Sequence, residues 1–328
     1  KCVLWTGDGN SGRSITGVVF QPDFVWLKMR NATGAHFLYD SVRGSTNGLH
    51  SNLTDAETAY SDGLLSFNND GFSLGNRSNN NGSGNTYAAW CWKAGGAAVS
   101  NTDGSITSQV SVNQTAGFSI VSYTGTGANA TVGHGLNKTP KFIITKQRTT
   151  ASHHWRTYHS SIGATKSVYL DLTNAQTGVD AGFMNSTEPT TSVFSIGTDT
   201  NINENTQAHI AYCWAEIEGF SKFGSYTGNG NADGPFVYCG FKPAFVITKR
   251  TDGTSNWIIL DSSRGPTNPD LGWLYPNLSY FEEHGSGRHV DFLSNGFKLR
   301  TAGTDINASG TYIFMAFAES PFQTANAK

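Results

Sequence analysis

One pattern occurs three times in this chain, and it limits the possible fold more than any other feature. Each copy begins with an aromatic residue followed by Thr-Gly-x-Gly, and a later proline opens an apolar run that ends in lysine. The three runs are Pro22–Lys28, Pro140–Lys146 and Pro243–Lys249. Because a period of about one hundred residues is too long for a solenoid repeat, each copy is predicted to be a small domain or one lobe of a larger body.

Each copy also has the marks of short antiparallel strands. The proline falls at the first position of a strand, where it removes no ladder hydrogen bond. The pairs Asp70-Gly71 and Asn295-Gly296 are typical of tight turns. Every copy closes on an aromatic strand; these strands are Thr86–Trp92, Ala208–Trp214 and Thr311–Phe317. About seven strands per copy without a helical period predict an all-β fold of three homologous antiparallel β-sandwich lobes in tandem.

The repeat also predicts the domain boundaries. The first copy covers residues 1–96, the second residues 117–220 and the third residues 221–328. Residues 97–116 contain alternating apolar positions and are predicted to form a linker strand or hairpin. The second and third copies meet with almost no linker, so we expect these two lobes to pack tightly.

Composition and charge narrow the function. The formal net charge is -2 and 14% of the residues are charged, which is below the roughly 25% of ordinary soluble domains. Polar surface must therefore come from Ser, Thr and Asn, as in rigid secreted or virion proteins. No basic stripe is present that could neutralise phosphates, so nucleic acid is not expected as a partner. No apolar run approaches the length of a membrane span, so no membrane insertion is expected.

The four cysteines do not predict a disulfide scaffold. Cys91 and Cys213 occupy the same position in two copies, each between aromatic neighbours, and are predicted to be buried core thiols. Cys2 and Cys239 lie at unrelated positions of the repeat. A bond between these two remains an alternative at this stage.

Two motifs pair an aspartate with an arginine three residues later. Asp40 with Arg43 and Asp261 with Arg264 could be a catalytic acid and its electrostatic partner. An Asp before an Arg at a strand exit is ordinarily a turn cap with a local ion pair, and we favour that interpretation.

A histidine cluster covers His153, His154 and His159. Imidazoles can bind zinc, but His153 and His159 would stand about 20 Å apart along an extended strand. We therefore expect no metal site and no cofactor. The hairpin register around Thr251–Thr254 predicts that Lys249 lies across from Trp257, with its ammonium on the indole face, and that Lys146 lies near Trp155 in the same way.

Several segments resemble a repeat in virion structural proteins of marine tailed phages, including phages of cyanobacteria. They are Pro22–Arg30, the turn Asp40–Gly44, Ser66–Gly75 and Thr86–Gly96. The resemblance implies a structural or tail-fibre role and supplies no catalytic residues. The second copy departs most, because His159–Gly163 replaces the Asp-Ser-x-Arg-Gly turn.

Three functions follow from these observations. The first is a non-enzymatic virion structural protein in a tail fibre, spike or other appendage that contacts the host surface, with glycans as candidate ligands. The second is an architectural head-decoration or adaptor protein. The third is a polysaccharide depolymerase with two carboxylates, for which the available glutamates are Glu216, Glu218, Glu282 and Glu283.

The first function predicts a homo-oligomer that contacts other virion proteins. It also predicts a protein that is assembled in the host cytoplasm and is part of the extracellular virion after release. Binding should reside where the copies differ, because shared residues already hold the common fold. The candidate ligand-binding residues are Trp273, Tyr275, Tyr280 and His284 in the third copy, and His153, His154 and Tyr158 in the second. A contact between lobes is the alternative role for these aromatic residues.

Overall fold

The computed structural model describes residues 1–269 and 272–320, and β-strands form almost all of its regular structure. The helices are short: α1 (Ser78–Asn81), α2 (Ala181–Met184), α3 (Thr200–Asn203) and the 3-10 helix η1 (Ser286–Arg288). The strands of the sheets pair in antiparallel fashion. The predicted all-β fold class is confirmed.

Each copy builds one large sheet, and four strands have the same order in all three. The order is the first strand of the copy, the last strand, the strand that carries the repeated lysine (the lysine strand) and the strand after it. In the first copy these are β1 (Cys2–Thr6), β9 (Thr86–Trp92), β3 (Phe24–Met29) and β4 (Phe37–Asp40). In the second they are β12 (Phe118–Thr124), β18 (Ala208–Ala215), β14 (Pro140–Gln147) and β15 (Arg156–His159). In the third they are β19 (Ser221–Gly228), β27 (Gly310–Ala318), β21 (Pro243–Arg250) and β22 (Trp257–Asp261).

Further strands extend two of these sheets. The first sheet continues through β5 (Gly44–Leu49) and β6 (Thr58–Ala59), and the second through β16 (Val168–Tyr169). The segment between the first and second copies contains the hairpin β10 (Val99–Asn101) and β11 (Ser108–Asn113), and β11 pairs with β12. This hairpin therefore belongs to the sheet of the second copy.

A smaller sheet faces each large sheet across an apolar layer, which gives each copy the character of a β-sandwich. The small sheets are β2 (Arg13–Ile15), β8 (Gly71–Leu74) and β7 (Leu64–Asn68); β13 (Ala130–Gly133) and β17 (Val193–Ile196); and β20 (Phe236–Tyr238), β26 (Gly296–Leu299) and β25 (Val290–Leu293). The third copy adds the pair β23 (Gly272–Trp273) and β24 (Glu283–His284). Each layer is an outer core that one copy builds alone.

The lysine strand of each copy is buried on both of its faces. In β3, Val25 and Leu27 point into the outer core of the first copy, whereas Phe24 and Trp26 point the other way. Since side chains alternate along a strand, one lysine strand supplies two different cores. This explains why these runs are apolar throughout and do not alternate with polar residues.

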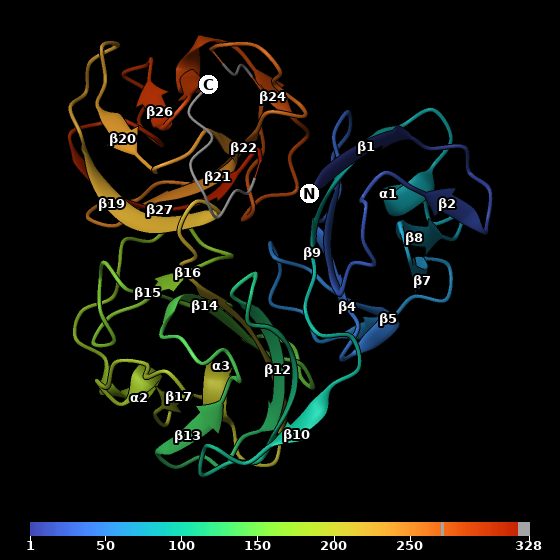
Figure 1. Cartoon of the computed structure of the whole chain (residues 1–328), viewed down its shortest axis with the longest axis vertical. Coiled ribbons are helices and arrows are strands. Elements are labelled where there is room, and N and C mark those ends of the chain that lie inside the picture. The colour runs from blue at the N-terminus through green and yellow to red at the C-terminus, as the bar shows by residue number, and fades with distance from the viewer. Residues whose placement is uncertain (270–271, 321–328) are drawn as a thin grey trace.

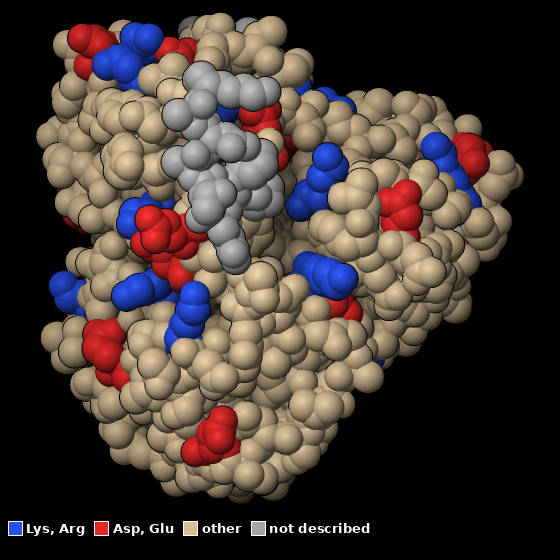
Figure 2. Space-filling view, in the orientation of Figure 1, with Lys and Arg blue, Asp and Glu red and all other residues tan. Residues whose placement is uncertain are grey.

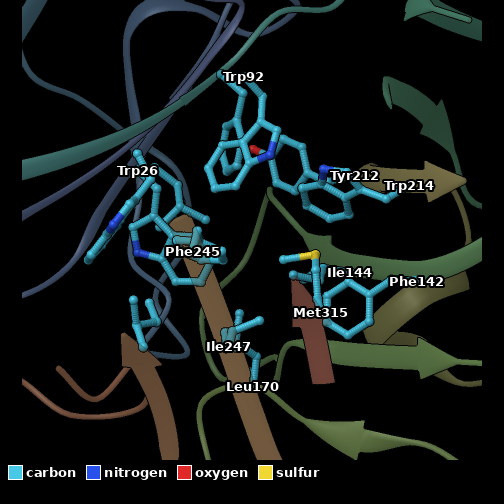
Figure 3. Packing of buried hydrophobic residues seen from close by; sticks show 14 of the residues in the cluster. Trp26, Trp92, Phe142, Ile144, Leu170, Tyr212, Trp214, Phe245, Ile247 and Met315 are labelled. Carbon is cyan, nitrogen blue, oxygen red and sulfur yellow. The ribbon is translucent and has the colours of Figure 1, made fainter. Parts of the chain in front are cut away.

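The second of these cores is shared by all three copies. It contains Phe24, Phe142 and Phe245, which are matching residues of the three lysine strands. Figure 3 shows Trp92, Trp214 and Phe245, each from a different copy, in this central core. The copies follow one another in the sequence, but in space they surround a common centre (Figure 1). The central core makes them one body with approximate threefold symmetry.

All four cysteines are free thiols. Cys91 and Cys213 are buried, as predicted, and burial raises the pKa of the Cys91 thiol to about 12. The alternative of a bond between Cys2 and Cys239 is wrong.

Candidate functional site

The repeated lysines join the copies to one another. Lys28, Lys146 and Lys249 are fully buried. Their Nζ atoms donate to carbonyl oxygens of neighbouring copies: Lys28 to Ser279 (3.4 Å), Lys146 to Thr54 (3.4 Å) and Lys249 to Thr173 (3.0 Å). The first copy thus contacts the third, the second contacts the first and the third contacts the second. The three contacts close a ring.

Burial without a neighbouring carboxylate in hydrogen-bond range weakens the charged form of these lysines. It lowers the pKa of Lys28 to about 7 and the pKa values of Lys146 and Lys249 to about 8. The predicted register is correct, because Lys249 pairs with Trp257 across the hairpin. The predicted ammonium–indole contact is wrong, because Nζ of Lys249 also donates to the carbonyl of Ser255 (2.7 Å). Within the described residues the cation–π contacts all use arginine.

In each copy a ring N–H also donates to a carbonyl of a neighbouring copy, in the same cyclic order as the lysines. Nε2 of His36 lies 2.9 Å from the Tyr275 carbonyl oxygen. Nε1 of Trp155 donates to the His50 carbonyl, and Nε1 of Trp257 donates to the Tyr169 carbonyl (2.8 Å each). Nδ1 of His36 accepts from Nε1 of Trp26 (2.9 Å). That contact places the His36 proton on Nε2, which donates to Tyr275. Burial keeps the pKa of His36 well below its ordinary value, so the ring is neutral.

A buried ion network reinforces the contact between the first and second copies. Arg43 forms ion pairs with Asp40 and with Glu57 (2.9 Å), and all of its side chain is buried. Glu57 also pairs with Arg148 of the second copy (2.8 Å). Tyr212 of the second copy donates its hydroxyl to Asp40 (2.7 Å). Burial opposes the charge of Glu57, but the two arginines outweigh it and lower the Glu57 pKa.

The contact between the third and first copies has the same network. Arg264 pairs with Asp261 (2.5 Å) and with Glu282 (2.7 Å). Glu282 also pairs with Arg30 of the first copy (2.6 Å), and Trp90 of the first copy donates Nε1 to Asp261 (2.9 Å). The two networks are equivalent residue by residue, with Trp90 in the place of Tyr212.

The contact between the second and third copies lacks these charges. His159 and Ile162 stand in the places of Asp40 and Arg43, and Gln176 stands in the place of Glu57. The backbone contact is retained, because the Gln176 amide donates to Thr251 (2.8 Å) as the Glu57 amide donates to Arg148 (2.8 Å). Thr251 matches the partner arginine, so both sides of the ion pair are replaced together.

The Asp–Arg motifs are therefore structural, as predicted. Oδ1 of Asp40 accepts from the amides of Val42 (3.0 Å) and Arg43 (2.9 Å), which is the expected turn cap. Sequence reasoning missed the reach of this motif to the neighbouring copy. The signal was present in the sequence. Glu57 and Glu282 occupy matching positions, and their partners Arg148 and Arg30 each stand two residues after the repeated lysine.

The predicted site residues of the third copy divide into a buried pair and an exposed pair. Trp273 and Tyr275 are buried in the outer core, and Nε1 of Trp273 donates to the Tyr275 hydroxyl (2.9 Å). The guanidinium of Arg288 covers both rings, at 5.0 and 5.6 Å from their centroids. Tyr280 is 53% exposed and the His284 side chain is 60% exposed. Only the exposed pair is placed to meet a ligand, and its binding role stays a prediction.

The predicted residues of the second copy have separate partners. Nε2 of His153 lies 3.3 Å from Glu204, and Nδ1 of His154 lies 2.6 Å from Asp171. Tyr158 is buried and donates its hydroxyl to Glu188 (2.6 Å). These three residues therefore do not converge on one point. In the part of the chain that the structure describes, no group of three or more His, Cys, Asp or Glu side chains could hold a metal ion.

Three of the four glutamates proposed for catalysis have structural partners. Glu282 belongs to the buried network, Glu283 accepts from Trp273 (3.0 Å), and Glu216 pairs with Lys222 (2.7 Å). These contacts support structural roles for the three side chains.

A cavity of about 640 Å³ lies where the three copies meet. The aromatic residues that line it are Phe20, Trp90, Trp92, Phe118, Phe220, Phe245 and Phe317. Cys2, Ser262, Ser263 and Glu319 are among its other lining residues. The walls are mainly apolar, so this cavity suits an apolar group better than a sugar.

The charged side chains on the face shown in Figure 2 occur in small groups, often with both signs together, on a surface that is mostly uncharged. Sequence reasoning missed one further feature of the surface, an exposed aromatic pair. Phe236 and Tyr238 on β20 are 43% and 63% exposed. They are unmatched in the other copies, which is the criterion that selected the predicted residues. Among the described residues, no helix has the length and apolar character that crossing a membrane requires.

Comparison with known families accounts for nearly the whole chain. A model for a domain of unknown function, DUF7483, matches residues 1–321. The chain belongs to the DUF7483 family. The match runs through all three copies, in agreement with a body that they build together. No curated protein and no solved structure matches the chain.

Proposed function

We propose that this DUF7483 protein is a non-enzymatic structural protein of a phage virion. It forms part of a tail fibre, spike or other appendage that contacts the host surface, and glycans are its candidate ligands. One observation carries the structural role: the most conspicuous charged motifs, Asp40–Arg43 and Asp261–Arg264, are buried in contacts between copies. The chain uses these charges to hold one rigid body together.

The assignment to a phage rests on the resemblance of the repeat to virion proteins of marine tailed phages. In this proposal the protein is assembled in the host cytoplasm, contacts other virion proteins as a homo-oligomer and is extracellular after release. The host contact rests on exposed aromatic residues of the third copy, because the other copies fold without them. Tyr280 aligns with Asp55 and Asn174, for example.

The test is to locate the protein on purified particles with gold-labelled antibodies. Label at the tail tip or fibres, together with competition between the purified protein and phage for adsorption to host cells, supports the proposal. Label on the capsid without competition favours the alternative of a head-decoration or adaptor protein. Release of new reducing ends from host polysaccharide by the purified protein favours the depolymerase.

A further inference from the structure

The outer face of the small sheet β20–β26–β25 carries two exposed aromatic rings. Phe236 and Tyr238 alternate with the buried Val237, so both rings stand on the same face of the strand. β20 is an edge strand of this sheet. A side chain at Gly296 would meet the Phe236 ring at 2.9 Å, which shows that this ring lies against the Gly296 backbone. The Val237 carbonyl also leaves no room for a side chain at this position.

The other two copies have no aromatic residue on this face. Phe236 pairs with Lys298, and the matching pairs are Ser14 with Ser73 in the first copy and Thr131 with Ser195 in the second. The same small sheet is therefore built twice with short hydroxyl residues. Packing of the lobe does not require the rings, and their exposure in the third copy needs another explanation.

Fixed charges stand beside the rings. Nζ of Lys298 donates to the Gly234 carbonyl (2.9 Å) and pairs with Asp233 (2.7 Å), whose side chain is 82% exposed. Lys298 also lies across from Asp291, which pairs with the half-exposed Arg300. Donors and an accessible carboxylate are thus held next to an apolar surface.

We infer that this face of the third copy, defined by Phe236, Tyr238, Lys298 and Asp233, binds a sugar unit of a bacterial surface polysaccharide. The inference rests on the proposed host contact and names its site. A pyranose has an apolar face of C–H groups that an aromatic ring covers, and hydroxyls that charged side chains bind. Strand β20 has three residues and is about 10 Å long. That size suits one or two sugars, whereas a stable protein interface needs about 800 Å² on each partner.

The experiment measures binding of the purified full chain to a printed array of bacterial capsular polysaccharides and lipopolysaccharides, and adsorption of the same protein to host cells. The variants are Phe236→Ala and Tyr238→Ala. Each should weaken binding to the glycans that the unchanged protein selects by about tenfold or more, because the removed ring covers the sugar. Unchanged thermal melting of each variant shows that the fold is intact.

Two control variants make the result specific. Val179→Ala shortens an exposed apolar side chain of the second copy and should leave array binding unchanged. Tyr280→Ala tests the other candidate position of the third copy. Tyr238→Phe keeps the ring and should retain most of the affinity. If Tyr280→Ala alone abolishes binding, the site lies there and the inference is wrong.

The remaining outcomes separate this inference from the proposed function. Adsorption to cells without binding to any glycan, or with unchanged binding by both ring variants, overturns the glycan site and leaves the host contact in place. Neither adsorption nor glycan binding overturns both.

Discussion

Replacement of Arg43 by isoleucine tests whether the buried network holds the first and second copies together. The guanidinium is fully buried and pairs with Asp40 and Glu57, and it also donates to the Tyr212 hydroxyl (3.2 Å) of the second copy. Arg43→Ile leaves two acidic side chains without that partner, and Asp40 is completely buried. Removal of one member of a buried ion pair costs about 3–5 kcal/mol. We expect the free energy of unfolding to fall by that amount.

The contact between the second and third copies supplies the matched comparison. A variant with five changes, Asp40→His, Arg43→Ile, Glu57→Gln, Arg148→Thr and Tyr212→Met, copies the residues found there. Because it leaves no unpaired charge, it should cost less than Arg43→Ile alone. This result would show that the single variant suffers from stranded charges and not from lost attraction.

Urea denaturation followed by tryptophan fluorescence measures both variants. Lys242→Ala is the surface control, since the Lys242–Glu319 pair is exposed and should contribute less than about 1 kcal/mol. The reasoning fails if Arg43→Ile costs no more than this control. It also fails if the five changes together cost as much as the sum of the separate variants.

Three further predictions concern buried groups. The pKa of Lys28 is about 7 in the fold and about 10.4 in the unfolded chain. Between these values the unfolded chain binds more protons, so the free energy of unfolding should rise with pH, by up to about 1.4 kcal/mol per pH unit. Lys28→Met should flatten this rise, and a slope equal to that of the unchanged protein would contradict the assigned pKa. Cys91 is buried with a pKa of about 12, so a thiol reagent at pH 8 should modify it only on unfolding; rapid labelling of the native protein would show an open path. Trp273→Ala should cost about 3–5 kcal/mol in thermal or urea unfolding, since the ring is buried, whereas Tyr280→Ala should stay within about 0.5 kcal/mol; equal effects would contradict the division of this cluster into a buried and an exposed pair.

The all-β fold and the hairpin register could be predicted from the sequence. The repeated apolar runs that begin with proline indicate strands in every copy. The register that places Lys249 across from Trp257 follows from the hairpin alone. The central core could not be predicted in this way, because a strand that is buried on both faces has no alternation to show which residues face a neighbouring copy. The lysine contacts were mispredicted for the same reason: Thr173 lies 76 residues before Lys249, and only the ring of three copies brings its carbonyl close.

The candidate site was predictable only in part. Unmatched aromatic residues are visible in the sequence, but exposure is not. Trp273 was selected because the first copy has no aromatic residue at the matching position, yet Trp273 and Tyr275 pack under Arg288 in the third outer core. Phe236 and Tyr238 meet the same criterion, and the structure shows that both are exposed. The alternation with Val237 was the available signal. Successive side chains of a strand point to opposite faces, so a strand that buries Val237 in the core turns both flanking rings outward.

The uneven distribution of charge among the three contacts also specifies the order of the ring. In the observed order Arg148 of the second copy meets Glu57 of the first, and Arg30 of the first meets Glu282 of the third. A ring closed in the opposite order would place Thr251 of the third copy against Glu57, and Gln176 of the second against Arg30. Glu57 would then keep only Arg43 of its own copy, and Arg30 would lose its carboxylate partner. Loss of these two pairings disfavours that order, so the charge-free contact between the second and third copies acts together with the two charged contacts to select the observed order.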